Sequence, residues 1–233
     1  MSSGRHSISI DPELLFKPIK INTSNVLWQG CWHLAHDPVH WDVPIWKTRG
    51  YNSAEEHFHG LINNWNSVAN DETIGFSLGD SAFGNKAFDN LKFFLESIKF
   101  KTIYLMSGNH SASWTQILDG LDSNIWRIAD DKHVILVPNY LEAFVCGQPI
   151  VNSHYPILGQ NGAARGSWML HAHVHGNLGK SEIGKLYQSR GKNKEVSVEV
   201  APIPLSFKDL QEYFKDRENF APDHHTASTQ NPF

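Results

Sequence analysis

The sequence predicts an α/β protein with mixed β-sheets, and three observations lead to that prediction. Apolar runs with strand character alternate with amphipathic helical segments through the first half of the 233-residue chain. The second half contains several closely spaced strand-like runs. Short clusters rich in His, Asp and Asn follow five of these runs, as expected where the strand ends of an α/β sheet converge at one edge.

The first half is predicted to contain three strands separated by two helices. The strands are expected at residues 25–30, 73–78 and 102–106. A helix is expected over residues 53–68, because its apolar side chains recur on one helical face and should pack against a sheet. Ser53 followed by Glu56 gives the pattern of a capping box at its start. A second helical stripe of apolar side chains covers residues 87–98.

The second half is predicted to be richer in strands. A short helix over residues 113–121 is expected to precede most of them. The strands are expected at residues 133–137, 141–146, 149–152, 168–173, 185–188 and 195–200. Residues 190–194 have the composition of a turn, so the last two strands should form a hairpin.

The C-terminal part divides into a helix and a tail. Ser206 and Asp209 give the pattern that starts a final short helix. The tail over residues 217–233 is polar and carries two prolines, so we expect it to be disordered. A chain of this length can bury one large core, and residues 1–216 are therefore expected to form a single domain.

The composition indicates a soluble globular protein, with 40% hydrophobic and 19% charged residues. Two cysteines, Cys31 and Cys146, are too few for a disulfide framework and fit a reducing compartment. The sequence shows no signal-peptide pattern and no run near the roughly 18 apolar residues that span a bilayer, so we expect a cytoplasmic protein without a membrane partner. A net charge of −4 gives no general attraction to nucleic acid.

Five polar clusters carry the candidate chemistry. In chain order they are Cys31-Trp32-His33, Gly79-Asp80, Gly108-Asn109-His110, Ser153-His154 and His173-Val174-His175. The Gly-Asp and Gly-Asn pairs are also common in turns, so each is a weak signal alone. The last cluster is stronger. In extended chain, residues two apart point to the same side about 6.6 Å apart, so its two histidines can reach neighbouring metal ions.

Histidine is the unusual residue in the composition, with 14 in the chain. Six of them are assigned by default to the ordinary class of partly exposed, hydrogen-bonded side chains: His6, His57, His59, His133, His224 and His225. The others are set apart because they fall beside Asp, Asn or another His at motif spacing.

Taken in order, the clusters resemble the signature of the calcineurin-like metallophosphoesterase family. That signature runs Asp-x-His, Gly-Asp, Gly-Asn-His-Asp/Glu, a lone His and Gly-His-x-His. The matching segments are Cys31-x-His33, Gly79-Asp80, Gly108-Asn109-His110-Ser111, His154 and Ala172-His173-Val174-His175. Residues 49–66, 79–84 and 165–168 resemble small bacterial and phage-type members. The resemblance spans residues 25–205 and implies a four-layer α/β/β/α sandwich, in which helices flank two mixed sheets.

The resemblance also implies a binuclear centre that hydrolyses a phosphomonoester or phosphodiester. One divalent ion would be held by Asp80, Asn109, His154 and His173, and the other by Asp80, Cys31, His33 and His175. Asp80 would bridge two ions, with zinc, iron or manganese expected. A water or hydroxide between the ions becomes nucleophilic near neutral pH. His110 would protonate the leaving oxygen or stabilise developing charge.

Three positions depart from the family signature. Cys31 stands where the family has an aspartate, and two interpretations are open. A thiolate would keep the charge and favour zinc or iron, whereas a neutral thiol would leave the first ion weakly held. Ser111 replaces an acidic residue, and Ala172 replaces a glycine.

Three further residues are candidates for substrate binding. His36 matches a second histidine of the same branch and would either contact phosphate or be exposed. Arg165 could clamp a phosphate with its planar guanidinium, or be an exposed loop residue. Arg49 also matches the branch and is a weaker candidate.

Two alternatives to a general phosphoesterase stay open. A binding or scaffold protein could keep the fold and lose turnover through Cys31 and Ser111, although six of the seven ligand positions match. A nuclease acting on DNA or RNA would be a special case of phosphoester hydrolysis and would need a basic groove. The available basic residues form only a modest cluster, which a solvated hairpin explains more simply: Lys180, Lys185, Arg190, Lys192 and Lys194.

Overall fold

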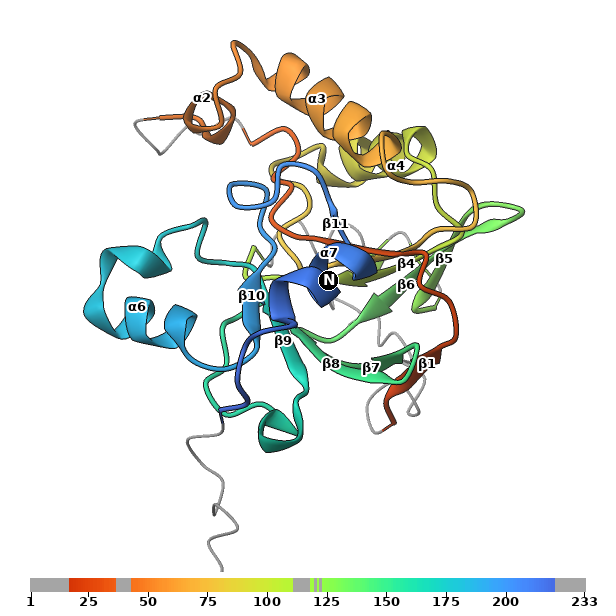
Figure 1. Cartoon of the computed structure of the whole chain (residues 1–233). Helices are drawn as coiled ribbons and strands as arrows, with labels where there is room; N and C mark the ends of the chain where they lie inside the picture. Colours follow the sequence, from red (N-terminus) through yellow and green to blue (C-terminus); the bar gives the residue numbers. More distant parts are fainter. Residues whose placement is uncertain (1–16, 37–42, 111–117, 120, 122, 221–233) are drawn as a thin grey trace, which may run out of the picture.

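The computed structural model describes residues 17–36, 43–110, 118–119, 121 and 123–220. Within these residues the protein has an α/β fold with two mixed sheets (Figure 1). One sheet has six strands in the order β11-β2-β3-β4-β6-β5, and the other has five in the order β1-β7-β8-β9-β10. The predicted α/β class with mixed sheets is confirmed.

The six-stranded sheet has a parallel centre and two antiparallel edges. Its strands are β11 (Leu205–Ser206), β2 (Val26–Gln29), β3 (Ile74–Ser77), β4 (Thr102–Met106), β6 (Lys132–Val137) and β5 (Ile125–Ala129). The four central strands are parallel to one another, and β11 and β5 run antiparallel to their neighbours. Parallel strands are buried on both faces, which explains their nearly continuous apolar sequences. The edge strand β5 was not among the predicted elements.

The five-stranded sheet is built around one hairpin. Its strands are β1 (Ile19–Ile21), β7 (Tyr140–Val145), β8 (Gln148–Ser153), β9 (Trp168–His171) and β10 (Asn193–Glu195). β7 and β8 pair antiparallel, whereas β1–β7, β8–β9 and β9–β10 are parallel pairs. As a result β8 and β9 end at the same edge of the sheet.

Two helices cover one face of the six-stranded sheet, α3 (Ala54–Asn66) and α4 (Ala87–Ser97) (Figure 1). Leu61 and Trp65 of α3 are buried in a core that includes residues of β2, β4 and β6, and Phe58 packs at its margin. Gly75 of β3 allows this packing, because a Cβ there would lie 3.1 Å from the Trp65 ring. The predicted packing of this helix on a sheet is confirmed.

The opposite face of the six-stranded sheet packs against the five-stranded sheet. This second core combines Trp28, Phe76 and Met106 with residues of β7, β8 and β9, and with α7 (Phe207–Phe214). Strand residues alternate between the two cores: Leu27 lies in the first core and its neighbours Val26 and Trp28 lie in the second. This alternation follows from the two-residue period of a strand.

The outer face of the five-stranded sheet carries a short helix, α6 (Glu182–Ser189), at its β9–β10 end. The Tyr187 ring of α6 contacts the His171 ring of β9 at 5.6 Å between centroids. On β7, Tyr140 and Phe144 remain 41% and 37% exposed. Among the described residues, the fourth layer of the expected sandwich is therefore limited to this end of the sheet.

Capping side chains fix the starts of two predicted helices. Ser53 Oγ accepts a hydrogen bond from the Glu56 amide at the start of α3, but the Glu56 carboxylate accepts from the Asn52 amide instead of completing a capping box. At the start of α7, Ser206 and Asp209 form both bonds of the box.

The predicted strand at residues 185–188 is wrong, because this segment belongs to helix α6. The Ser181 hydroxyl accepts a hydrogen bond from the Gly184 amide and caps the helix. Residues 190–194 are consequently not a hairpin turn, because Asn193 and Lys194 already belong to β10, which pairs parallel with β9. The strand predicted at residues 195–200 is regular only at its first residue, since β10 ends at Glu195 and the chain then turns.

Two other predictions fall largely outside the described residues, the helix at 113–121 and the disordered tail at 217–233. The first residues of that tail are described and packed: the Arg217 guanidinium donates to the Gly191 carbonyl at 2.9 Å. Among the described helices, none has the length and apolar character to cross a bilayer.

Buried histidine makes the stability of the fold sensitive to acid. His171 is 1% exposed, and burial lowers its pKa from 6.5 to about 4. Between these values the unfolded chain binds the proton and the folded chain does not, so stability is full above pH 6.5 and falls as the pH drops towards 4. At the acid end of this range, protonation linked to His171 alone should lower the free energy of unfolding by on the order of 3 kcal/mol. Thermal unfolding of chelator-treated protein across this range should show a shallower acid slope for His171→Gln; equal slopes would contradict this role.

Candidate metal centre

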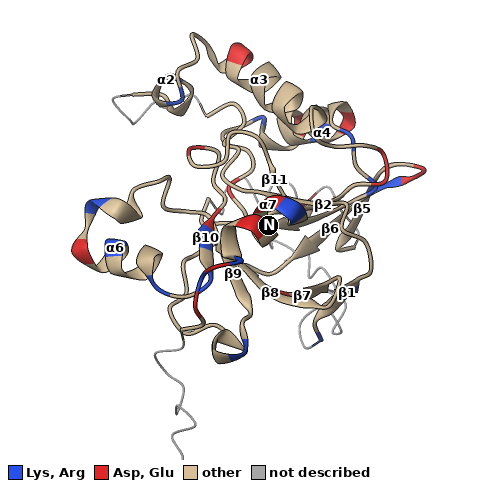
Figure 2. Cartoon of the chain, viewed as in Figure 1, with Lys and Arg blue, Asp and Glu red and all other residues tan. Residues whose placement is uncertain are grey.

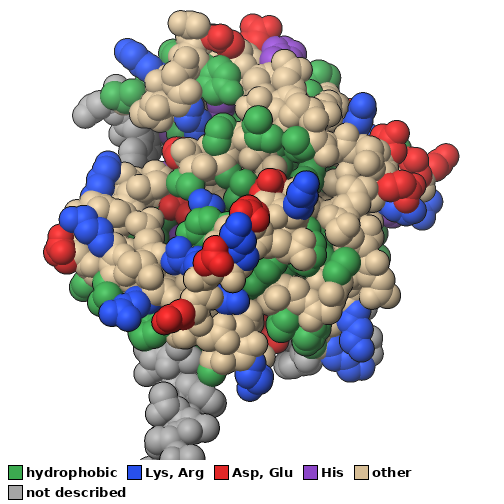
Figure 3. Space-filling model, viewed as in Figure 1, with side chains coloured by type: hydrophobic (Ala, Val, Ile, Leu, Met, Phe, Trp, Pro, Cys, Tyr) green, Lys and Arg blue, Asp and Glu red, His purple; other side chains and the backbone are tan. Residues whose placement is uncertain are grey.

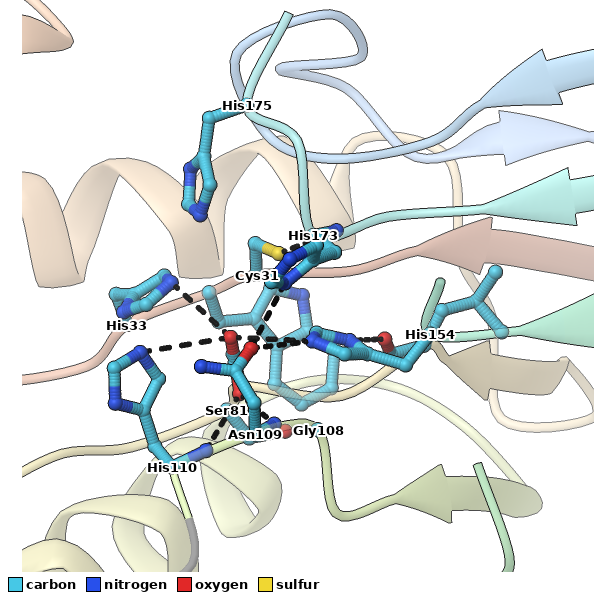
Figure 4. Close-up of polar contacts among 12 residues, drawn as sticks. Cys31, His33, Ser81, Gly108, Asn109, His110, His154, His173 and His175 are labelled. Atoms are coloured by element: carbon cyan, nitrogen blue, oxygen red, sulfur yellow. Dashed lines mark hydrogen bonds and ion pairs between the residues drawn. The ribbon is translucent and has the colours of Figure 1, made fainter. Parts of the chain in front are cut away.

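The five polar clusters come together at the carboxyl ends of five strands (Figure 4). Cys31 and His33 follow β2, Asp80 follows β3, Asn109 and His110 follow β4, His154 follows β8, and His173 and His175 follow β9. The strands in each sheet that carry these residues are parallel, so their carboxyl ends share an edge. The expectation that strand ends would gather these residues is confirmed.

The Asp80 carboxylate is the centre of the cluster, and its two oxygens have different surroundings. Oδ1 accepts hydrogen bonds from the backbone amides of Asn109 and His110, at 2.9 and 3.2 Å. Oδ2 lies 3.4 Å from His154 Nε2, 3.6 Å from His110 Nε2 and 3.8 Å from His33 Nε2. Three imidazoles from three separate strands thus meet one carboxylate oxygen.

Left-handed backbone conformation is concentrated at the candidate ligands. Five of them have positive φ: Cys31 at 57°, His33 at 49°, Asp80 at 53°, His173 at 67° and His175 at 50°. Among the described non-glycine residues only Ala35 and Cys146 share this conformation. Each such residue costs about 1–3 kcal/mol and persists only where surrounding structure enforces it. Strain of this kind is typical of functional sites.

Two glycines permit the close approach of the clusters. A Cβ at Gly108 would lie 2.0 Å from Asp80 Oδ1, and one at Gly79 would lie 2.6 Å from His154 Nδ1. Both residues also have positive φ, at 79° and 94°. The Gly-Asp and Gly-Asn pairs, weak signals in the sequence, are therefore required by the packing around the carboxylate.

Asn109, His154 and His173 form one side of the cluster. The Asn109 Oδ1 atom lies 2.8 Å from His154 Nε2 and 2.9 Å from His173 Nδ1. His154 Nδ1 lies 2.7 Å from the Leu78 carbonyl, which only a protonated nitrogen can satisfy. In the neutral tautomer that donates from Nδ1 to this carbonyl, His154 Nε2 would carry the lone pair that a histidine metal ligand requires.

Cys31, His33 and His175 form the other side. One ligand atom from each lies within 4.8 Å of the others, and Cys31 makes a similar group with Asp80 and His154. The Cys31 Sγ atom accepts a hydrogen bond from the His173 amide at 3.3 Å. His33 Nε2 is buried without a hydrogen-bond partner among the described residues. A buried, unpaired nitrogen beside a carboxylate and a sulfur fits a metal ligand, so these residues could hold a metal ion.

The local electrostatics keep most of these groups in their ligand forms. Burial, together with the Arg49 charge, holds the pKa of His33 well below 6.5, so it is neutral. Burial alone would raise the pKa of Asp80, but its contacts with His154 and His110 lower it. Cys31 is the exception, since burial and the Asp80 charge raise its pKa well above 9.0. Without a cation beside it, Cys31 is a neutral thiol.

A partly buried ion pair between Arg49 and Glu199 supports the Cys31 and His175 side of the cluster, and no sequence motif indicated it. The Glu199 Oε1 atom lies 2.8 Å from His175 Nδ1 and accepts hydrogen bonds from Arg49 Nε and Nη2 at 2.9 and 2.7 Å. Arg49 also donates to the carbonyls of Cys31 and Trp32. Glu199 thereby fixes the His175 ring through Nδ1, and within the described part of the chain His175 Nε2 has no hydrogen-bond partner.

Replacing Glu199 with glutamine should loosen the His175 ring, because a neutral amide holds an imidazole N–H less firmly than a carboxylate does. We expect zinc to bind about 10- to 100-fold more weakly, as is typical for outer-shell partners of a ligand histidine. Metal titration with a competing chelator would measure the change. Glu182→Gln is a suitable control, since the Glu182 side chain is 90% exposed on α6; equal losses in both variants would contradict the role of Glu199.

The structure moves several predicted residues to other roles. Arg49 links the loop after β2 to Glu199 through hydrogen bonds. Its side chain is only 3% exposed, so it does not face the site opening. Arg165 precedes β9, whereas the cluster follows the other end of that strand, so it is not positioned to clamp a phosphate there. His36 is 8% exposed and packs beside His33 and Phe83, which excludes the exposed alternative.

The histidines assigned to the partly exposed class differ in their surroundings. His57, assigned to the partly exposed class, is 2% exposed and lies 2.9 Å from an Arg49 nitrogen. His59 is exposed and His133 half-buried, while His6, His224 and His225 lie outside the described residues, as does Ser111.

The basic residues at 180–194 do not form a continuous positive surface. Lys185 pairs with Glu182 within α6 at 2.8 Å, and Lys194 lies over the Tyr213 ring at 4.6 Å. Charges of both signs occur on α6 (Figure 2), and they are interspersed on the molecular face that Figure 3 shows. Nothing in this distribution favours a nucleic-acid groove.

Comparisons with known proteins indicate the fold of this chain but do not indicate its function. No protein-family model matches the chain, and no curated protein matches it. It is similar to the crystal structure of AQ665, a protein of unknown function from Aquifex aeolicus, with 16% sequence identity and a TM-score of 0.57. The similarity covers 81% of this chain and 98% of that chain. At this identity the likeness shows the α/β architecture alone.

Proposed function

We propose that this protein is a metal-dependent phosphoester hydrolase of the calcineurin-like metallophosphoesterase type, with two divalent ions bridged by Asp80. One observation carries the proposal: Asp80 Oδ2 faces the Nε2 atoms of His33, His110 and His154 within 3.4–3.8 Å, while two amides hold Oδ1. An oxygen placed in this way is suited to bridge two cations.

The two sides of the cluster give the two proposed ligand sets. Cys31, His33 and His175 would hold the first ion, and Asn109, His154 and His173 the second, each set sharing Asp80. The sulfur and imidazole donors of the first set favour zinc or iron over calcium, whereas the second set, with two oxygen and two imidazole donors, also suits manganese. When bound, the ions supply Lewis acidity, which makes a water molecule acidic and offsets phosphate charge.

The protein's own side chains supply binding charge and a proton. The cluster contains one carboxylate and one cysteine against several neutral donors, so it retains positive charge for a phosphate once cations are present. His110 is 25% exposed and holds Nε2 3.6 Å from Asp80 Oδ2, beside the ring of His33. From that position it can donate a proton to the leaving oxygen of a phosphoester.

Replacing His110 with asparagine should slow hydrolysis on the order of a hundredfold, the lower limit for loss of a general acid. Metal content should be unchanged, because Asn109 and Asp80 stay in place. The loss should shrink for substrates with good leaving groups, which need no proton. An equal loss with good and poor leaving groups would contradict the role of His110 as an acid.

The proposal as a whole is tested by elemental analysis and activity. Protein purified without chelators should contain about two transition-metal ions per chain and should hydrolyse bis(p-nitrophenyl) phosphate or p-nitrophenyl phosphate with manganese, zinc or iron. Failure to hydrolyse either substrate with any metal, together with binding of a protein partner, would support the scaffold alternative. The exposed His59→Ala variant serves as a control for nonspecific effects.

A further inference from the structure

We infer that the substrate of this enzyme is a phosphoester of an apolar alcohol, whose apolar group lies in a groove beside the metal centre. The inference rests on the proposed function for the phosphate end of the substrate. The evidence for the apolar group is separate: it is the groove itself, which is formed by α6 and two loops.

The groove has the size and composition of a small-molecule site. Its volume is about 660 Å³, and small-molecule pockets typically measure about 300–1,000 Å³. Its apolar lining includes Pro156, Leu158, Leu178, Ile183, Leu186 and Phe220. Arg190 is its charged lining residue and holds its guanidinium 6.0 Å from the Phe220 ring centroid. A neutral apolar group on an anionic ester is the chemistry that fits this lining.

Both walls of the groove continue directly from proposed metal ligands. Pro156 is two residues after His154, and Leu178 is three residues after His175. Consecutive Cα atoms are about 3.8 Å apart, so the walls begin within about 8 and 12 Å of those two ligands. A single small molecule can therefore reach both places.

Tyr155 provides aromatic surface between the ligands and the groove. Its ring lies 4.9 Å from the His154 ring and 4.7 Å from the His173 ring, and the residue is 41% exposed. The next residue along the chain, Pro156, already lines the groove. Tyr155 thus places a partly exposed aromatic ring against the second ligand set, one residue before the groove begins.

The groove is held in shape before any ligand binds. The Tyr187 hydroxyl donates to the Ile157 carbonyl at 3.2 Å and ties α6 to the loop after His154. Helix α6 also sits very close to the other wall, since a Cβ at Gly184 would lie 1.9 Å from the Leu178 carbonyl oxygen. Between these supports Leu158, Ile183 and Leu186 remain 57%, 83% and 57% exposed. Exposed apolar side chains gathered in a fixed groove indicate a ligand site.

Calorimetric titration of methyl phosphate and hexyl phosphate into the metal-containing protein tests the inference. Each buried methylene strengthens binding about fourfold, so hexyl phosphate should bind at least tenfold more tightly. In the Ile183→Ser/Leu186→Ser double variant this preference should fall below about threefold, with methyl phosphate affinity unchanged. Ile125→Ser removes a comparably exposed apolar side chain on β5 and should keep the preference.

The outcomes separate this inference from the proposed function. Hexyl phosphate that binds no better than methyl phosphate, including no binding of either, overturns the groove. The groove is also overturned if the double variant keeps the preference for hexyl phosphate. A third contrary result would be sedimentation showing that the two substitutions only separate a dimer formed through α6. A tenfold preference without hydrolysis of any alkyl ester supports the groove and overturns the hydrolase.

Discussion

Replacing Asp80 with asparagine is expected to remove both the hydrolytic activity and the bound metal. Asparagine keeps an oxygen that can accept the amides of Asn109 and His110, but it loses the charge that faces three histidines. Since Asp80 is proposed to contact both ions, neither site should stay filled. We expect a fall in kcat/KM of at least about a thousandfold, near the limit of detection for a site that depends on metal-activated water.

Replacing His154 with alanine separates the two ligand sets. His154 contacts Asn109 on one side of the cluster, whereas Cys31, His33 and His175 lie on the other. The variant should therefore lose activity and retain about one metal ion per chain, as measured by elemental analysis. Retention of two ions with full activity in either the Asp80 or the His154 variant would contradict the binuclear centre. Circular dichroism and thermal unfolding in chelator would show whether each variant is folded.

Replacing Cys31 with serine is expected to remove about one metal ion per chain and to shift the metal preference. Burial and the Asp80 charge raise the pKa of the Cys31 thiol, so only a cation beside it would make it a thiolate. If it is a ligand, the first site prefers zinc or iron. Cys31→Asp would supply the oxygen ligand of the family signature and favour manganese or magnesium.

The measurement is metal content and rate across a series of ions for the wild type, Cys31→Ser and Cys31→Asp. Cys146→Ser is the matched control, because Cys146 is exposed on the β7–β8 turn. Unchanged stoichiometry, metal preference and rate in Cys31→Ser would mean that Cys31 only packs in the second core. The centre would then work mainly from Asp80, Asn109, His154 and His173.

Local sequence patterns determined the elements that their own side chains stabilise. The helix at residues 53–68 could be predicted because its cap and apolar face lie within one continuous segment. The strands before each polar cluster were equally visible, and parallel strands share a carboxyl edge. The convergence of Asp80, His154 and His173 could therefore be expected before any distance was known.

Tertiary structure decided whatever depends on partners far away in the chain. The segment at residues 185–188 is a helix because Ser181 caps it and Tyr187 packs on β9, which its short mixed sequence did not reveal. Glu199 became part of the site through contacts with His175, 24 residues earlier in the chain, and Arg49, 150 residues earlier. No local motif encodes such a pairing.

The same division applies to the metal centre itself. Residue types and their order were enough to propose candidate ligands, because the potential metal donors follow strand ends that share an edge. Which oxygen of Asp80 faces the histidines, and which histidine nitrogen is free, depended on hydrogen bonds to Leu78, Asn109 and Glu199. Arg165, adjacent to β9 in sequence, was placed at the opposite end of that strand. Direction along a strand and the orientation of a ring are properties of the assembled sheets, so only the folded protein fixed them.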